Sequence, residues 1–307
     1  MIRIHLDTDL GSDTDDLCAL TMLLGWPDVE LTGITTVNDP GGIRAGYVAY
    51  ALELAGRRDI PVAAGAEGSF GGFMVPLAFP DYWPAPIERR PSPPGEALRV
   101  IADSVEAGAI VVAIGPYTNL AAFEAWHPGA LRDAGTVVMG GHVPAAAAGY
   151  PPWGMHDDFN VQQDATAARV VFDRCEPTVV PVPSCLKVTL RGRDLSRLRA
   201  SGALGKLLAD QGERHAVDNG RTELPAAFPA LPEDLLNFQY DPLACAVAVG
   251  WSNVEISELG VALSIEDGLL RMELDDAAVR MRVVTDVDAD AFAEAWLSAV
   301  ERASVTR

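Results

Sequence analysis

The chain has 307 residues, of which 49% are hydrophobic, so it is long enough and apolar enough to bury a large core. Its formal net charge of −20 repels phosphate backbones and anionic lipids, and we therefore expect neither nucleic acid nor a membrane surface as a partner. A small neutral substrate and a cation remain compatible with this charge.

Apolar, β-rich runs alternate with helical patterns through the first part of the chain. The predicted strands cover residues 2–6, 30–37, 60–64, 109–114, 136–139 and 178–182, and the predicted helices cover about 16–25, 42–55, 95–107, 119–126 and 164–172. The runs at 110–115 and 136–141 are apolar throughout, which is typical of strands covered on both faces. The pattern predicts an α/β fold with an open, mostly parallel central β-sheet flanked by helices.

Beyond residue 182 the pattern predicts a helix after Arg193, a helix at 241–249, a β-rich stretch at about 253–284 and a final helix at about 289–302. We find no linker, repeat or low-complexity tract, and therefore expect a single domain spanning residues 1–307. Sheets of this kind bind ligands at the carboxyl ends of their strands, so functional residues should follow strands.

The cysteines and the apolar runs indicate the cellular setting. No pair among Cys18, Cys175, Cys185 and Cys245 has CxxC spacing, and we expect buried free thiols. The first residues run straight into a strand, which predicts no signal peptide, and no apolar run reaches the length of a membrane span. We therefore expect a cytoplasmic protein.

A cluster of acidic residues follows the first predicted strand. The segment HLDTDLGSDTDDLCAL holds five aspartates within ten positions, namely Asp7, Asp9, Asp13, Asp15 and Asp16. Acidic residues in the first turn of a helix complement its dipole, which explains one or two of them. Five adjacent carboxylates require a neutraliser, and a hard cation with oxygen ligands is the usual one.

Two other metal motifs begin in a similar way. An EF-hand loop counted from Asp7 would need glycine at its sixth position and an acidic residue at its twelfth, where this chain has Ser12 and Cys18. A magnesium-dependent phosphohydrolase using Asp7 and Asp9 usually has threonine or valine where this chain has Gly11. The first motif is excluded, and the second is kept as an alternative that the sequence disfavours.

The aspartate segment resembles the amino-terminal signature of the nucleoside hydrolases, DxDxGxDD, with two additional residues before the paired aspartates. Further motifs follow in the order of that family: GITTVND at 33–39, IPVAAGA at 60–66, AIGPYTNLA at 113–121, VVMGGH at 137–142, DFNVQQD at 158–164 and YDPLACA at 240–246. The resemblance covers about residues 1–250 and implies the nucleoside hydrolase fold with its Rossmann-like core. It also implies hydrolysis of an N-glycosidic bond in a ribonucleoside, and a homodimer or homotetramer.

The resemblance assigns roles to individual residues. Asp9, Asp16 and Asp241 correspond to carboxylate ligands of one Ca²⁺ per chain, and the backbone carbonyl of Thr118 corresponds to a further ligand. Asp9 also corresponds to the general base, which takes a proton from the attacking water. The implied substrate contacts are Asp15 on a ribose hydroxyl, Asp158 and Asn160 on the sugar, Asn38 or Asp39 also on the sugar, and Met139 in the pocket wall.

Some of these positions have structural alternatives. Thr118 and Asp241 can serve as caps of the helices that follow them, and residues 158–160 can form an ordinary polar turn. Calcium accepts about six to eight oxygen ligands, so protein groups, two ribose hydroxyls and a water can share one ion. The joint occurrence of the motifs favours the hydrolase interpretation.

The chain departs from the family at the group that activates the leaving base. The inosine-uridine branch has histidine directly before the last aspartate, where this chain has Tyr240, and residues 68–94 contain no histidine. Tyr240 can donate a proton, although a phenol with a pKa of about 10 is a poor acid at neutral pH. Alternatively, aromatic residues stack on the base; the loop candidates are Tyr82, Trp83, Tyr150 and Trp153. A calcium-dependent nucleoside-binding protein with little activity is therefore a second alternative.

Overall fold

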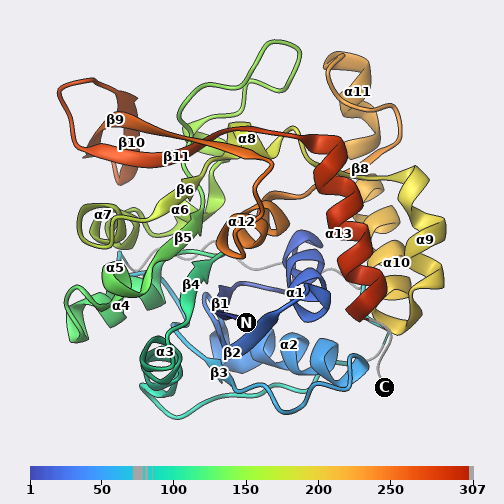
Figure 1. Cartoon of the computed structure of the whole chain (residues 1–307), viewed down its shortest axis with the longest axis horizontal. Helices are drawn as coiled ribbons and strands as arrows, with labels where there is room; N and C mark the ends of the chain where they lie inside the picture. The colour runs from blue at the N-terminus through green and yellow to red at the C-terminus, as the bar shows by residue number, and fades with distance from the viewer. Residues whose placement is uncertain (72–78, 80–81, 85, 304–307) are drawn as a thin grey trace.

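A nine-stranded sheet forms the centre of the computed structural model, which describes residues 1–71, 79, 82–84 and 86–303 (Figure 1). Its strand order is β10-β9-β11-β6-β5-β4-β1-β2-β3. The strands are β1 (Ile2–Thr8), β2 (Val29–Thr36), β3 (Val62–Ala64), β4 (Ile110–Ala113), β5 (Thr136–Met139), β6 (Thr178–Val180), β9 (Val254–Glu266), β10 (Leu269–Leu274) and β11 (Arg280–Val287). Strands β7 (Thr189–Arg191) and β8 (Leu235–Phe238) form a separate antiparallel pair.

Most of the sheet is parallel. Every neighbouring pair from β11 to β3 is parallel, whereas β9 runs antiparallel to both β11 and β10. The chain moves outward from β1 through β2 and β3, and then returns to place β4 on the other side of β1. The strand order therefore reverses between β1 and β4, and this is the point at which such sheets form a ligand crevice at their carboxyl ends.

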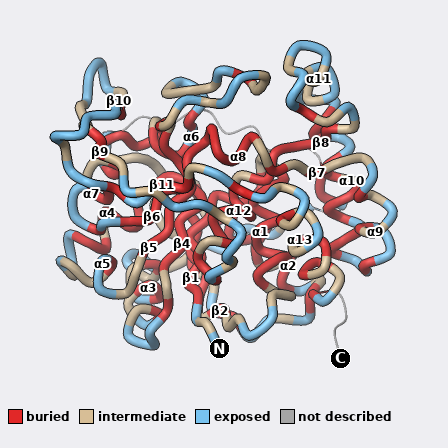
Figure 2. Tube along the Cα trace, turned by 45° about the horizontal axis from the view of Figure 1, so that its top comes forward, coloured by how far each residue is buried: buried red, intermediate tan, exposed pale blue. Residues whose placement is uncertain are grey.

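Helices cover both faces of the sheet, as Figure 1 shows. One face packs against α1 (Asp15–Gly25), α2 (Ile43–Leu54), α12 (Tyr240–Ala248) and α13 (Ala289–Ala303), and the other packs against α3 (Glu96–Glu106), α4 (Thr118–Trp126) and α7 (Ala165–Arg174). Successive side chains of a strand point to opposite faces, so Val112 joins the first hydrophobic cluster while Val111 joins the second. Figure 2 shows that the central strands are buried. The predicted α/β fold with a mostly parallel sheet in one domain is confirmed.

Shorter elements complete the chain. They are α5 (Ala130–Ala134), α6 (Phe159–Gln163), α8 (Val182–Cys185), α9 (Leu195–Ala200), α10 (Gly202–Asp218), α11 (Leu224–Ala227) and the 3₁₀ turns η1 (Pro40–Gly42), η2 (Met155–Asp157), η3 (Gly192–Asp194) and η4 (Arg221–Glu223). The single helix predicted after Arg193 is in fact the pair α9 and α10. The strand predicted at 178–182 ends at Val180, because Pro181 cannot donate a backbone hydrogen bond to a sheet.

The cysteines and the helices bear on the expected cellular setting. All four cysteines are buried and free, as predicted. In the part of the chain that the structure describes, no helix combines the length and the apolar character needed to cross a membrane.

Candidate active site

A cavity of about 630 Å³ lies at the carboxyl ends of four neighbouring parallel strands. Asp9 follows β1, Ile114 follows β4, Met139 ends β5 and Val182 lies two residues after β6, and all four side chains line this cavity. The cavity therefore occupies the crevice where the strand order reverses, which is where the topology places a ligand.

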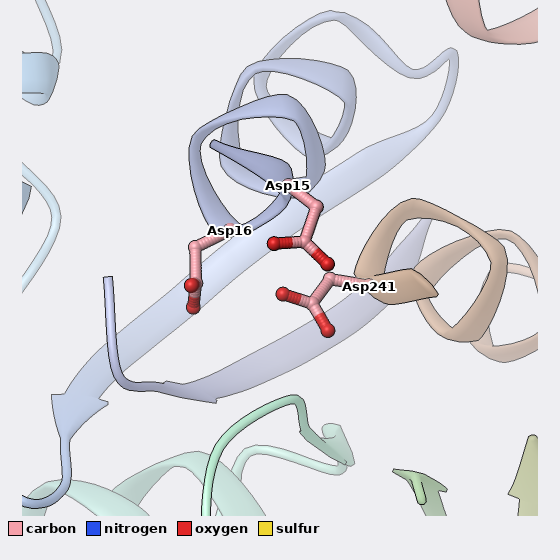
Figure 3. Close-up of side chains that lie close together, drawn as sticks. All are labelled: Asp15, Asp16 and Asp241. Atoms are coloured by element: carbon pink, nitrogen blue, oxygen red, sulfur yellow. The ribbon is translucent and has the colours of Figure 1, made fainter. Parts of the chain in front are cut away.

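Three buried carboxylates meet in this cavity. Asp15 and Asp16 begin α1 and Asp241 lies in the first turn of α12, and Figure 3 shows their carboxylates turned toward a common space. One oxygen of each lies within 4.8 Å of the others. Burial raises the pKa of each of these three carboxyls well above its usual range, and the neighbouring carboxylates raise it further.

This group has the donor chemistry of a cation site. The three residues offer only carboxylate oxygens, which hard divalent cations prefer. Among the described residues, the side-chain hydrogen bond to these carboxylates is the one that the Thr8 hydroxyl donates to Asp16. Most of the negative charge of the three carboxylates is therefore not offset by hydrogen bonds from side chains. A cation bound among the three carboxylates would offset both the burial and the repulsion that raise their pKa values.

Asp9 lines the same cavity but lies outside that group of three. Its side chain is almost fully buried, and its Oδ2 lies 3.6 Å from Nη2 of the buried Arg44. Burial raises the pKa of Asp9, and the charge of Arg44 opposes this rise. A Cβ atom at Gly115 would lie 2.9 Å from Asp9 Oδ1, so glycine at this position leaves room for the carboxylate. Asp9 is therefore held between β4 and α2.

The loop between Asp9 and α1 is shaped by Gly11 and Asp13. Gly11 has a φ of 133°, and a Cβ atom there would lie 2.6 Å from the ring of Tyr47, so the loop requires glycine at this point. Asp13 Oδ1 accepts a hydrogen bond of 2.7 Å from Asn237 Nδ2 of β8 and lies 3.5 Å from His215 Nε2 of α10. Burial alone would raise the pKa of Asp13, but His215 and Arg221, together with hydrogen bonds from the Thr14 amide and Asn237, lower it overall.

Asp158, Asn160 and Met139 form the neighbouring part of the wall. Asp158 Oδ2 accepts a hydrogen bond of 2.7 Å from the Gly141 amide, and Asn160 Nδ2 donates to the carbonyl of Ile114 at 2.9 Å and to that of Met139 at 3.1 Å. These bonds fix both side chains to the ends of β4 and β5. The structure thus brings Asp9, Asp15, Asp16, Asp241, Asp158, Asn160, Met139, Trp153 and Tyr240 to one cavity.

Asn38 and Asp39 were the two alternatives for a sugar contact. Neither residue lines the cavity, and their side chains differ in their hydrogen bonds. The Asp39 carboxylate accepts hydrogen bonds from the Thr36 hydroxyl and from the amides of Arg44 and Ala45, so it holds the start of α2. Asn38 has a left-handed φ of 51°, and its side-chain amide has no hydrogen-bond partner among the described residues. The side chain of Asn38 therefore keeps its hydrogen-bonding capacity, whereas that of Asp39 is used within the fold.

Two further predicted site residues lie outside the cavity wall. Thr118 begins α4 and is buried, and its hydroxyl donates a 2.7 Å hydrogen bond to Asp164. Trp83 does not stand in the wall as a platform for a base: its ring packs in the core, 4.5 Å from the ring of Tyr47 and 5.9 Å from that of Tyr50. The predicted role of Trp83 is therefore corrected to packing, because its ring is buried against these tyrosines and does not line the cavity.

One wall of the cavity was not foreseen from the sequence. The end of α10 and the turn after it contribute His215, Asp218, Asn219 and Arg221. The available signal was a polar cluster around the Asn219-Gly220 pair, which ends the helix. Such clusters are also common on surfaces, so the pattern alone did not distinguish a cavity wall from an exposed helix end.

Tyr240 and Trp153 line the cavity on either side of Phe238. The ring of Phe238 lies 5.3 Å from that of Trp153 and 5.5 Å from that of Tyr240. Burial raises the pKa of Tyr240 well above its usual range, although the charge of Arg221 opposes this rise. Tyr240 is therefore an even poorer acid here than a free phenol.

A family model and several relatives match the chain. The model described as inosine-uridine preferring nucleoside hydrolase matches residues 4–294. A probable uridine nucleosidase of Arabidopsis thaliana is 30% identical over 59% of this chain and 58% of its own length. A pyrimidine-specific ribonucleoside hydrolase of Citrobacter koseri is 29% identical over 66% of each chain. These alignments thus span about three fifths to two thirds of the relatives' own lengths.

Solved structures resemble this chain over nearly its whole length. A plant nucleoside hydrolase superposes with a TM-score of 0.76 at 21% identity and covers 99% of both chains. A purine-preferring ribonucleoside hydrolase from Gardnerella vaginalis superposes with a TM-score of 0.75 at 24% identity and covers 99% of this chain and 100% of its own. At these identities the superpositions establish a shared fold.

Proposed function

The chain belongs to the inosine-uridine preferring nucleoside hydrolase family, and from this premise we propose that it hydrolyses the N-glycosidic bond of a ribonucleoside with the help of calcium. The observation that carries the proposal is the meeting of Asp15, Asp16 and Asp241 beside Asp9 in one cavity. Such a group suits a sugar diol and a cation, because both can be held by carboxylate oxygens.

The proposed ligands of the cation are Asp9, Asp16, Asp241 and the Thr118 carbonyl, and Asp15 is proposed to accept a hydrogen bond from a ribose hydroxyl. The coordination sites of Ca²⁺ would be divided among these protein oxygens, the ribose hydroxyls and a water, and the ion would make that water more acidic. The support for this arrangement is that Asp16 and Asp241 lie, with Asp15, in one group of buried carboxylates whose charges a cation would offset.

The other steps depend on side chains of the chain itself. Asp9 takes a proton from the attacking water while the water oxygen approaches C1′ of the ribose. Asp158 and Asn160, fixed to the strand ends, orient the sugar, and Asn38 offers its unsatisfied amide to it. Positive charge develops on the sugar ring as the glycosidic bond lengthens, and the surrounding carboxylates stabilise this charge.

The charge of the cavity favours an unphosphorylated substrate. Eight aspartates line it, namely Asp9, Asp13, Asp15, Asp16, Asp157, Asp158, Asp218 and Asp241, and a phosphate group would be repelled by them. The relatives named above are described as acting on uridine, pyrimidine or purine nucleosides. We therefore propose a ribonucleoside as the substrate and leave the base to experiment.

A second candidate function is calcium-dependent nucleoside binding without efficient turnover. The observation that favours it is the buried Tyr240, whose raised pKa makes it a poor replacement for a protonating histidine. A release assay separates the two functions: the purified protein is incubated with purine and pyrimidine nucleosides, with calcium or with chelator, and free base and ribose are measured. Calcium-dependent release supports hydrolysis, and binding without release supports the second function.

The assembly and the cellular setting belong to the same proposal. We propose a homodimer or homotetramer, supported by the family resemblance, and a cytoplasmic protein, supported by four buried free thiols of the kind that a reducing compartment preserves. Light scattering after size exclusion measures the assembly directly.

A further inference from the structure

Arg221 is the first residue of η4 and lines the cavity next to α10. Its guanidinium is placed by two aromatic rings, with Cζ 5.2 Å from the centre of the Trp153 ring and 5.4 Å from that of Phe238. Stacking of this kind holds a guanidinium in position without using its N–H donors. Arg221 therefore keeps its hydrogen-bonding capacity for another partner.

No such partner is found within the described parts of the chain. Nε of Arg221 is buried without a hydrogen-bond acceptor, and the guanidinium forms no ion pair with a described carboxylate. The acidic residues of the same wall are engaged elsewhere: Asp13 accepts from Asn237, and Asp218 accepts a 2.7 Å hydrogen bond from the Tyr82 hydroxyl. The charge of Arg221 acts on Asp13, but its N–H donors remain free for an electron-rich occupant of the cavity.

Contacts between rings connect Arg221, through Phe238 and Tyr240, with the end of the cavity that holds Asp241. The ring of Phe238, over which Arg221 lies, is 5.5 Å from that of Tyr240, and Tyr240 directly precedes Asp241 of the carboxylate group. A ribose held by the carboxylates would therefore direct its base toward Tyr240, Trp153 and Arg221. The described residues place no other guanidinium in the cavity wall.

We propose that Arg221 contacts the departing base and stabilises the negative charge that forms on it when the C1′–N bond breaks; this rests on the hydrolase function proposed above. The electron pair of that bond stays with the base, the hydroxyl of the attacking water bonds to C1′, and Asp9 takes the remaining proton of the water. The base takes up a proton from solvent as it leaves, and Asp9 returns its own proton to solvent.

The chemistry of the guanidinium fits this task. A guanidinium remains charged throughout the ordinary pH range, and its planar N–H donors match electron-rich oxygen and nitrogen atoms. A charge-assisted hydrogen bond to a developing anion strengthens as the charge forms, which selectively stabilises the transition state. Removing one such donor commonly lowers turnover by about 10²–10³-fold.

The test compares the parent, Arg221→Ala and Arg221→Lys on two substrates that differ in their need for stabilisation of the leaving group. A nucleoside cleaved by the parent needs it, whereas a nitrophenyl riboside releases a stable anion. We expect Arg221→Ala to lose about 10²–10³-fold in kcat on the nucleoside but only a few-fold on the nitrophenyl riboside. The kcat of Arg221→Lys on the nucleoside should lie between those of the parent and Arg221→Ala, because lysine keeps the charge but loses the planar donors.

Chemical rescue and a control variant complete the experiment. Guanidinium ion, added well below denaturing concentration, should restore part of the nucleoside turnover of Arg221→Ala but should not affect the parent. Arg58→Ala, which removes an exposed arginine paired with Glu53, is the matched control and should behave as the parent. Unchanged turnover in Arg221→Ala, or equal losses on both substrates without rescue, would overturn the assignment. If the parent cleaves neither substrate, the hydrolase function itself fails and the role of Arg221 falls with it.

Discussion

Replacement of Asp241 by asparagine should have opposite effects on stability with and without calcium. Asp241 lies within 4.8 Å of two other buried carboxylates, and two unit charges at that distance repel by about 3.5 kcal/mol at an effective dielectric constant of about 20. Protonation relieves part of this repulsion, because burial raises the pKa of all three groups. Without a cation, we therefore expect Asp241→Asn to stabilise the protein by roughly 2 kcal/mol, which corresponds to about 4 °C in Tm.

Calcium should reverse the order of the two proteins. At about 100 times its Kd, a bound ion adds about 2.7 kcal/mol to the parent, whereas the variant has lost a carboxylate ligand and gains much less. Because the folded-state pKa of Asp241 is raised, the stability that its protonation supplies is present at low pH and is lost as the pH rises through that value. The advantage of the variant in chelator should therefore shrink in acid.

The assay is thermal unfolding of both proteins in chelator and in saturating calcium. Asp103→Asn, the same charge change at an exposed position of α3, is the control and should respond to calcium as the parent does. If the variant is less stable than the parent in chelator, or gains as much stability from calcium as the parent, Asp241 neither repels its neighbours nor binds the ion.

Three further predictions concern other residues. Asp9→Asn should lose nearly all turnover at saturating calcium, because an amide cannot accept the proton of the attacking water; near-normal rates would exclude the role of base. Tyr240→Phe should keep most of its turnover on nucleosides, because burial raises the pKa of Tyr240 and leaves it a poor acid; a loss of about 10²–10⁴-fold would identify it as the acid. Burial lowers the pKa of His5 to about 3, so the stability that its neutral form supplies is present above about pH 6.5 and is lost as the pH falls toward 3. Urea unfolding between pH 7 and 4 should therefore show a smaller loss for His5→Asn than for the parent, and equal losses would contradict this.

The sequence was sufficient to predict the parts of the site that follow strands. The buried strand β1 leads directly into the aspartate segment, and the apolar run at 136–139 corresponds to β5, which ends at Met139. Parallel strands bring their carboxyl ends to the same edge, so Asp9 and Met139 reach one cavity although they are far apart in the chain. Regular topology explains why Asp9 was expected at the end of a strand, whereas the role of Met139 was implied by the family resemblance.

Residues whose role depends on tertiary packing were not predictable. Arg221 reaches the cavity because η4, which follows α10, packs against Trp153 and Phe238, and no local pattern encodes that contact. Asn38 and Asp39 differ because only the Asp39 side chain accepts hydrogen bonds from the start of α2. The sequence does not show which of two adjacent polar residues makes such bonds. In the sequence, Trp83 looks like an aromatic residue of a loop near the site, but in the structure its ring packs against Tyr47 in the core.

The decisive measurement is the release of ribose and free base from a panel of ribonucleosides by the purified protein, in calcium and in chelator. We expect equimolar ribose and base from at least one nucleoside, loss of this activity in chelator and its recovery when calcium is restored. Asp241→Asn should behave in calcium as the parent behaves in chelator. Turnover that is indifferent to chelator, or calcium-dependent nucleoside binding without release of any base, would contradict the account.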